Sequence, residues 1–204
     1  MHARMPPLVA RVAHPLCILA AMLAVGFAPL PSAAQVPAAP PKAALCESCH
    51  GPLGNSTNGL YPILAGQTFR YLYTELRDFQ AKRRNDPVMS PVAADLSADE
   101  AQALAQYFAA QKPVPTGFKP DPGRAAKGEK IATAALCTMC HLGGFAGQNE
   151  IPRVAGQQYD YIVKQLRDFK AKTRTNDGGN MTSVTSTMSD DDIVDVANYV
   201  AGLY

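Results

Sequence analysis

Two five-residue stretches decide the fold of this chain: Cys46-Glu47-Ser48-Cys49-His50 and Cys137-Thr138-Met139-Cys140-His141. Each reads C-x-x-C-H, the pattern at which a c-type haem is attached covalently. Two thiols three positions apart lie on one side of a helical turn, where both can add to the vinyl groups of one porphyrin. The next residue, a histidine, can then ligate the iron. A zinc or redox C-x-x-C beside an unrelated histidine is the alternative for a single stretch. Two equivalent stretches predict two covalently bound haem c groups.

The first 34 residues resemble a secretory signal peptide. They contain a basic start with Arg4 and Arg11, an apolar run over 16–27, and small residues at 32–34 where cleavage can follow. The apolar run is short for a bilayer span, although a retained membrane anchor is the alternative. Haem attachment in bacteria takes place outside the cytoplasm. The signal and the haem patterns together therefore predict the bacterial periplasm.

Counting histidines and cysteines limits how the irons can be ligated. His2, His14 and Cys17 lie within the predicted signal, so the mature chain keeps only His50 and His141. Both are needed as proximal ligands, which excludes bis-histidine ligation within one chain. The distal ligands must be methionine, lysine, water or nothing. The other four cysteines belong to the haem patterns, and none is left for a disulfide.

The chain after the signal is an internal repeat with an offset of about 90 residues. The repeated segments are 64–67 and 154–157, 76–79 and 166–169, 85–86 and 176–177, and 96–99 and 188–191. Between the copies, residues 111–122 contain four prolines, which forbid a helix and favour a stiff, extended connector. The predicted divisions are a signal over 1–34, haem domains over 35–112 and 123–204, and a linker over 113–122.

Each copy carries helical signals. Apolar residues recur every three or four positions over 69–79 and 159–169, which predicts an amphipathic helix whose stripe faces the core. The last helix of each copy begins with a capping pattern, Ser97-x-x-Glu100 and Ser189-x-x-Asp192. No segment alternates with period two for long. The predicted fold class is therefore all-α.

The mature chain has four methionines as candidate distal ligands. Met139 lies inside its own C-x-x-C-H turn, on the proximal side of the haem. Met89 precedes Leu96 by seven residues, and Met181 precedes Met188 by seven. The repeat thus pairs Met89 with Met181, in loops before the last helix, and makes Met188 the counterpart of a core leucine. The alternative is that Met188 replaces Met181 at the second iron.

Pro62 and Pro152 are candidates for a supporting role behind the iron ligands. They lie 12 and 11 residues after His50 and His141. A ligating histidine usually donates its other ring N–H to a carbonyl or carboxylate. A rigid proline can present its carbonyl oxygen for this purpose, although a simple turn proline is the alternative.

Two tandem haem domains with repeated A-G-Q, L-x-D-F and N-D…M patterns resemble the cytochrome c4 family. The resemblance covers essentially the whole mature chain and implies two class I cytochrome c domains in pseudo-twofold pairing, with His/Met ligation of both haems. It also implies electron delivery to a membrane-bound terminal oxidase and association with the outer face of the inner membrane. Relatives of this kind serve as cytochrome subunits of dehydrogenases, which is the second functional candidate.

One segment departs from the repeat. Gly128 precedes Cys137 in a predicted helix that crosses the last helix near Tyr199, where a glycine permits close backbone approach. The matching segment of the first copy, 36–41, has three prolines in six residues and cannot form that helix. We expect the first domain to have a shortened N-terminal helix and a more open flank.

Composition narrows the function classes. Without Arg4 and Arg11 the chain has 17 basic and 17 acidic residues, and its aromatic residues lie in the core stripes, so nucleic-acid binding is not expected. A di-haem peroxidase needs an open distal position, whereas both haems here have a methionine candidate. The chain is therefore predicted to be an electron-transfer protein and not an enzyme. A free carrier and a dehydrogenase subunit remain the two alternatives.

Overall fold

The computed structural model describes residues 37–204, so the predicted signal, with His2, His14 and Cys17, lies outside the described residues. Over 37–204 the chain forms α-helices and one short 3-10 helix, and its only β pairing is an isolated bridge between Gln148 and Ile151. No helix in this range has the length and apolar character needed to cross a membrane. The all-α prediction is confirmed.

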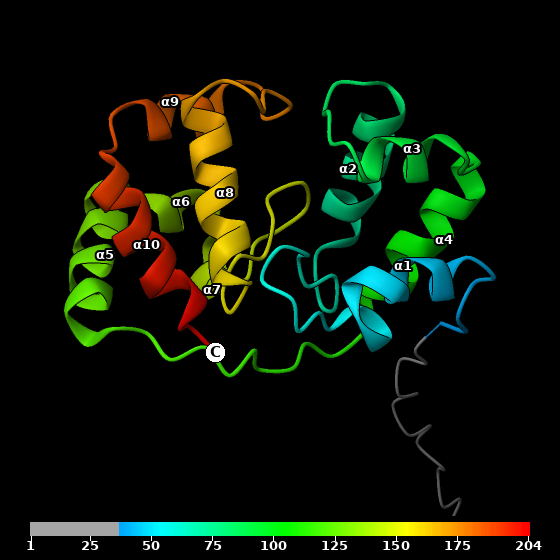
Figure 1. The fold of residues 1–204 in the computed structure, drawn as a ribbon, viewed down its shortest axis with the longest axis horizontal. Helices are drawn as coiled ribbons and strands as arrows, with labels where there is room; N and C mark the ends of the chain where they lie inside the picture. Colours follow the sequence, from blue (N-terminus) through cyan, green and yellow to red (C-terminus); the bar gives the residue numbers. More distant parts are fainter. Residues whose placement is uncertain (1–36) are drawn as a thin grey trace, which may run out of the picture. The chain divides into compact units, whose positions relative to one another are not determined.

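The helices form two groups that follow one another along the chain (Figure 1). The first group comprises α1 (Ala43–His50), η1 (Pro52–Gly54), α2 (Phe69–Gln80), α3 (Met89–Ala94) and α4 (Ala98–Ala109). The second comprises α5 (Pro122–Ala134), α6 (Cys137–Cys140), α7 (Leu142–Phe145), α8 (Tyr159–Lys170), α9 (Asn180–Ser186) and α10 (Asp190–Ala201). We call them the first and second domains. The described residues belong to one compact unit.

The connector between the domains is non-helical up to Asp121. The prediction that prolines exclude a helix throughout 111–122 is wrong at its last residue, because Pro122 begins α5. Proline is well tolerated at the first position of a helix, where its missing N–H has no intrahelical partner to lose. The Asp121 carboxylate accepts the Arg124 N–H at 2.8 Å and caps this helix.

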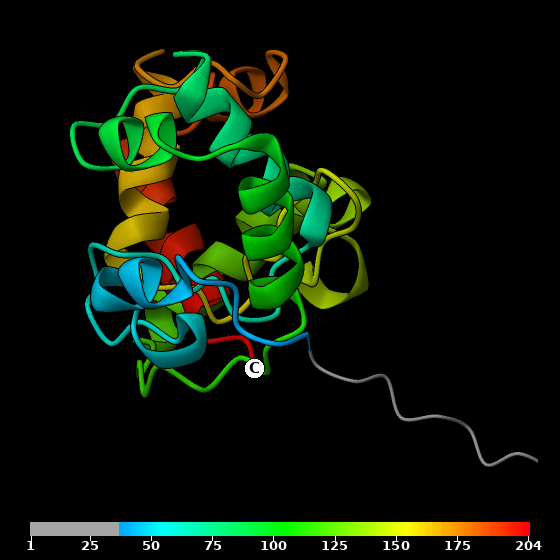
Figure 2. The same ribbon diagram turned by 90° about the vertical axis from the view of Figure 1, so that its right-hand side faces the viewer.

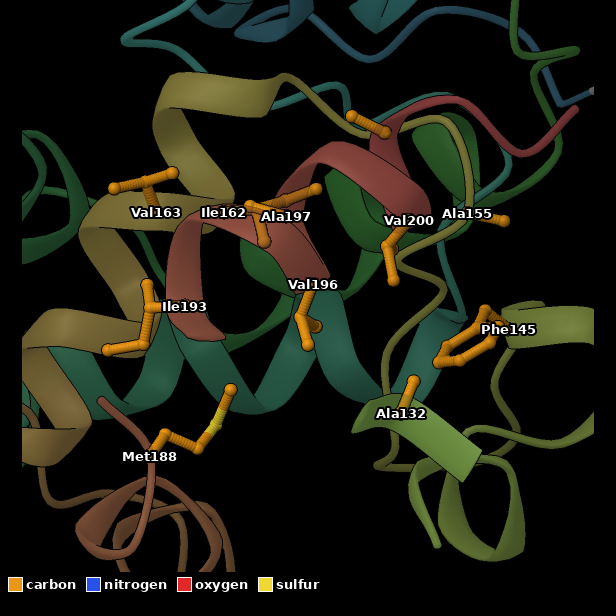
Figure 3. Packing of buried hydrophobic residues seen from close by; sticks show 11 residues of the cluster. Ala132, Phe145, Ala155, Ile162, Val163, Met188, Ile193, Val196, Ala197 and Val200 are labelled. Atoms are coloured by element: carbon orange, nitrogen blue, oxygen red, sulfur yellow. The ribbon is translucent and has the colours of Figure 1, made fainter. Parts of the chain in front are cut away.

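Each domain has its own hydrophobic core, built from the stripes that the sequence predicts. In the first domain, Leu72 of α2 packs with Leu104 and Phe108 of α4. In the second, Ile162 of α8 lies beside Ala197 of α10, as Figure 3 shows, and Val163 belongs to the same cluster. The α10 residues in this cluster are Ile193, Val196, Ala197, Val200 and Ala201. Both α4 and α10 begin with a complete capping box, at Ser97 and Ser189, as predicted.

The two domains differ at their N-terminal flanks. In the second domain α5 crosses α10 at Gly128, where an added Cβ would collide with the Asp195 carbonyl oxygen and with the Tyr199 side chain. In the first domain residues 37–40 are not helical, and α1 begins only at Ala43 (Figure 2). Lys42 Nζ donates there to the Asp95 carbonyl at 2.8 Å and to Glu100 at 3.1 Å. The predicted close approach at Gly128 and the shortened first helix are both confirmed.

Candidate functional site

The four cysteines of the C-x-x-C-H patterns lie on two short helices. Cys46 and Cys49 belong to α1, whereas Cys137 and Cys140 begin and end α6. The first cysteine of each pair is half-buried and the second is exposed. Burial raises the pKa of Cys46 to about 11 and also raises the pKa of Cys137.

The two histidines are buried and share one hydrogen-bond arrangement. His50 Nδ1 lies 2.8 Å from the Pro62 carbonyl oxygen, and His141 Nδ1 lies 2.9 Å from that of Pro152. A carbonyl only accepts, so Nδ1 carries the proton in both rings and Nε2 keeps its lone pair. Burial lowers the pKa of both imidazoles, and the bonds to the carbonyls offset only part of this effect. A neutral imidazole with a free Nε2 is the form that binds a metal.

Met89 and Met181 lie at the starts of short helices, not in the irregular loops that the sequence predicts. Met89 is the first residue of α3, and Met181 is the second residue of α9. In the first domain Asp86 Oδ1 accepts the N–H groups of Val88 and Met89, both at 2.9 Å. Its counterpart Asp177 accepts the N–H of Thr182 at 2.7 Å. These aspartates supply the acceptors that a helix start requires, which explains the difference.

The spacing between aspartate and methionine differs by one residue in the two copies. Met89 follows Asp86 by three positions, whereas Met181 follows Asp177 by four. Gly178 and Gly179, with φ of 62° and 85°, take up the extra residue in a left-handed conformation that glycine adopts without strain. Both methionines are half-buried.

The other two methionines occupy different environments. Met188 is 8% exposed and belongs to the core of the second domain, where Figure 3 places it among the side chains of α10. Its repeat counterpart Leu96 is equally buried in the first core. Met139 projects from α6 and is 66% exposed. Of the two candidates for the second iron, Met188 lies in the core and Met181 is half-buried at the start of α9.

Comparisons with known proteins place this chain among di-haem cytochromes. The family profile described as cytochrome c matches residues 125–203, and the profile for cytochrome c oxidase, cbb3-type, subunit III, matches residues 42–108. The chain is 36% identical to cytochrome c4 of Pseudomonas aeruginosa, over 92% of this chain and 98% of that protein. The chain belongs to the cytochrome c4 family.

Two further relatives agree with this family assignment. The crystal structure of reduced recombinant cytochrome c4 from Pseudomonas stutzeri superposes with a TM-score of 0.75 at 34% identity, covering 80% of this chain and 95% of that one. A thiosulfate dehydrogenase electron acceptor from Thiomonas intermedia is 38% identical over 80% of this chain and 81% of its own length. This cytochrome c4 family member therefore has two tandem class I cytochrome c domains, carries two covalently bound haem c groups and transfers electrons without being an enzyme.

The residues present fit the cofactor that the cytochrome c4 family implies. Each domain offers a pair of free thiols, a buried neutral imidazole with an available Nε2, and a half-buried methionine. This set matches the thiols that anchor haem c and the His/Met axial pair of cytochromes c.

A buried polar cluster joins the two cytochrome c4 domains, and no sequence pattern described above predicts it. Arg84 donates to Glu75 at 2.5 Å and to Gln165 at 2.8 Å. Arg174, its repeat counterpart, donates to the same two side chains at 2.6 and 2.7 Å. Burial alone would raise the pKa of Glu75, but the two guanidinium groups bring it below its ordinary value and keep the carboxylate charged.

Three pairs of side chains in the cluster are related by the repeat, and one of these pairs differs in charge. The identical pairs are Arg84 and Arg174, and Tyr71 and Tyr161, whose hydroxyls lie 3.2 Å from the guanidinium group of the opposite domain. The exception is Glu75, which is matched by the neutral Gln165. Apolar periodicity does not indicate these positions. Tyr71, Glu75, Tyr161 and Gln165 lie on α2 and α8 outside the apolar stripes, and the two arginines follow the ends of those helices. Aligning polar residues of the two copies would have revealed them.

Proposed function

We propose that each haem iron of this cytochrome has one histidine and one methionine ligand. The proposed pairs are His50 with Met89 and His141 with Met181, with covalent attachment at Cys46 and Cys49 and at Cys137 and Cys140. The observation that carries the proposal is the repeated Nδ1–H bond to Pro62 and Pro152, which leaves Nε2 of both histidines free to ligate. When bound, each haem takes up and releases one electron.

The surrounding residues hold these ligands in place. The Pro62 and Pro152 carbonyls fix the tautomer and orientation of the imidazoles and increase their basicity toward a metal. Asp86 holds the backbone of Met89 itself, and Asp177 holds the residue after Met181. A methionine in the distal position raises the reduction potential of a c-type haem, which suits an electron acceptor.

Mass measurement and absorption spectroscopy test the ligation. The intact mass and a haemochrome assay should give two haems per chain, and the oxidised protein should show the weak near-infrared absorption of an iron–sulfur(Met) bond. Met181→Ala should remove about half of this absorption, whereas the matched variant Met188→Ala should leave it intact, since Met188 lies in the core. Loss of the absorption in Met188→Ala alone would reassign the second ligand.

We further propose that this cytochrome operates in the bacterial periplasm, as the apparent signal peptide over 1–34 and the covalent haem attachment indicate. Its proposed acceptor is a membrane-bound terminal oxidase or a similar redox protein, reached by peripheral association with the outer face of the inner membrane. Cell fractionation, with the mass of the mature N-terminus, tests this. Recovery in the cytoplasm with residues 1–34 retained would contradict it.

A second candidate is a cytochrome subunit that accepts electrons from a periplasmic dehydrogenase. The relative from Thiomonas intermedia, whose name states that role, favours it. Purification from native membrane and periplasm should separate the two candidates. A stoichiometric dehydrogenase subunit bound to this chain would support the second, and recovery as a free protein that reduces oxidase-containing membranes would support the first.

A further inference from the structure

The glutamines that end the repeated A-G-Q segments each bind the backbone of the opposite domain. Gln157 donates from Nε2 to the Ile63 carbonyl at 2.9 Å and accepts the Ile63 N–H at 2.7 Å. Gln67 makes the same two bonds to Arg153, at 2.9 and 2.7 Å. The two side chains are 7% and 6% exposed. The four bonds form a reciprocal clasp that follows the repeat of the chain.

Each clasp acts on the peptide unit that supports a histidine. The Ile63 N–H and the Pro62 carbonyl are the two ends of one peptide group, and this carbonyl accepts the proton of His50 Nδ1. The Arg153 N–H and the Pro152 carbonyl are related in the same way, and that carbonyl serves His141. A hydrogen-bond chain therefore runs from each buried imidazole through one peptide group to a glutamine of the other domain.

Bonds in such a chain polarise one another. An acceptor on the N–H of an amide increases the negative charge on its carbonyl oxygen, which then attracts the imidazole proton more strongly. Stronger donation from Nδ1 makes the imidazole a better electron donor through Nε2. A ligand that donates more strongly favours the oxidised form of the metal that it binds.

We propose that Gln157 and Gln67 are positioning residues that lower the reduction potential of the haem in the opposite domain. This rests on the proposed function, in which His50 and His141 ligate the irons. Gln157 acts on the first haem through Pro62, and Gln67 acts on the second through Pro152. The clasp thus makes each redox centre depend on the docking of its neighbour.

Gln158 supplies a matched control on the same segment. Its Nε2 donates across the same interface to the Ser56 carbonyl at 2.6 Å, and it is as buried as Gln157. It makes no bond to the peptide group that supports His50. Removing its side-chain bond therefore loosens the interface without breaking the hydrogen-bond chain to an imidazole.

The experiment measures both potentials in the full-length di-haem protein and in Gln157→Met, Gln67→Met and Gln158→Met. Methionine keeps the length of the side chain but cannot make the hydrogen bonds of the glutamine amide. Redox titration by NMR would follow each haem through the signals of its own histidine, assigned by through-space contacts to Pro62 or Pro152. The exchange rate of each Nδ1 proton in the reduced protein gives a second readout.

In Gln157→Met the reduced-to-oxidised ratio of the first haem at a fixed potential should rise roughly two- to tenfold, with faster exchange of the His50 proton. The second haem should stay unchanged. Gln67→Met should show the reverse, and Gln158→Met should move neither haem.

The proposal is overturned if Gln157→Met leaves the first haem unchanged, if it shifts both haems equally, or if Gln158→Met has the same effect. If Gln157→Met does not fold, Gln67→Met tests the proposal instead. The proposal then fails if this variant leaves the reduction potential of the second haem unchanged. The near-infrared absorption of the wild-type protein separates a failure of the proposed ligation from a failure of the proposed role of the glutamines. Its absence would refute the ligation, whereas its presence with unmoved potentials would refute only the role of the glutamines.

Discussion

In the second domain α5 packs across α10 at Gly128. In the first domain a proline-rich segment leads directly into α1, and Lys42 bonds to the Asp95 carbonyl and to Glu100 of the last helix. The helix crossing buries Gly128 and Ala132 of α5, and Ala132 joins the core that α10 lines. The bond from Lys42 joins two partly exposed groups and contributes little, because water screens it and both side chains lose freedom. The same repeat thus closes its N-terminal flank by packing in one copy and by polar contacts in the other.

At the interface between the domains, it is the first domain that contributes the stronger contact. Glu75, the only carboxylate bound by both buried arginines, comes from the first domain, and the second domain offers the neutral Gln165 at the equivalent position. The second domain is more completely packed at its flank, but the first supplies the charge that joins the two. Glu75 therefore links the two domains, beside the glutamine bonds that cross the same interface.

Removing that charge should have the largest effect. Glu75→Gln makes the interface symmetric but leaves Arg84 and Arg174 without an anion, and it should lower the free energy of unfolding by about 3 to 5 kcal/mol. Urea denaturation of the holoprotein measures this. Gln165→Glu is the matched variant, because it also makes the interface symmetric but gives each arginine a carboxylate. Its free energy of unfolding should fall much less. Equal losses would show that symmetry, not charge pairing, governs the interface.

Breaking the helix crossing should have the next largest effect. Gly128→Ala places a methyl group against the Asp195 carbonyl, and the overpacking should destabilise the second domain by about 2 kcal/mol after the helix propensity of alanine is counted. Gly123→Ala on the same helix is the control, because an added Cβ there would meet one atom only, Asp121 Oδ1 at 3.3 Å, and no backbone. It should be neutral or slightly stabilising. Hydrogen exchange should show reduced protection in α5 and α10 of the Gly128→Ala variant. Reduced protection confined to the first domain would contradict the proposed difference between the two flanks.

Acid should weaken the interface through Glu75. Because the two arginines hold the pKa of Glu75 below its ordinary value, its stabilisation is fully present above pH 4.5 and is lost as the pH falls through the lower folded-state pKa. The free energy of unfolding, measured from pH 7 down to about pH 3, should therefore fall more steeply in wild type than in Glu75→Gln. Parallel curves would mean that other carboxylates dominate the acid response.

The smallest effect is expected at the flank of the first domain. Lys42→Ala removes contacts to the Asp95 carbonyl and to Glu100 near the surface, and its cost should be barely measurable and should shrink as salt is added. Thermal unfolding at low and high ionic strength is the measurement. A loss as large as that of Gly128→Ala would mean that the short flank is as tightly packed as the helix crossing.

The sequence by itself determined the features that depend on neighbouring residues. The helices over 69–80 and 159–170, the capping boxes at Ser97 and Ser189, and the burial of Met188 all follow from spacing along the chain. Helix geometry points residues three or four apart to one face, so apolar spacing specifies which side is buried. The two C-x-x-C-H patterns predicted two haem c groups in the same way, since both thiols and the histidine lie within one turn.

Only the tertiary structure decided which polar groups meet between the domains. Gln67 and Arg153 are 86 positions apart, and Glu75 and Arg174 are 99 apart. The helical starts at Met89 and Met181 also escaped prediction, because they depend on aspartate side chains that fold back onto the backbone. No local pattern encodes how two repeats dock. A buried polar side chain reaches its partner only once both cores have formed and their relative orientation is set, and for that reason Glu75, Gln67 and Gln157 acquired their roles from the assembled fold.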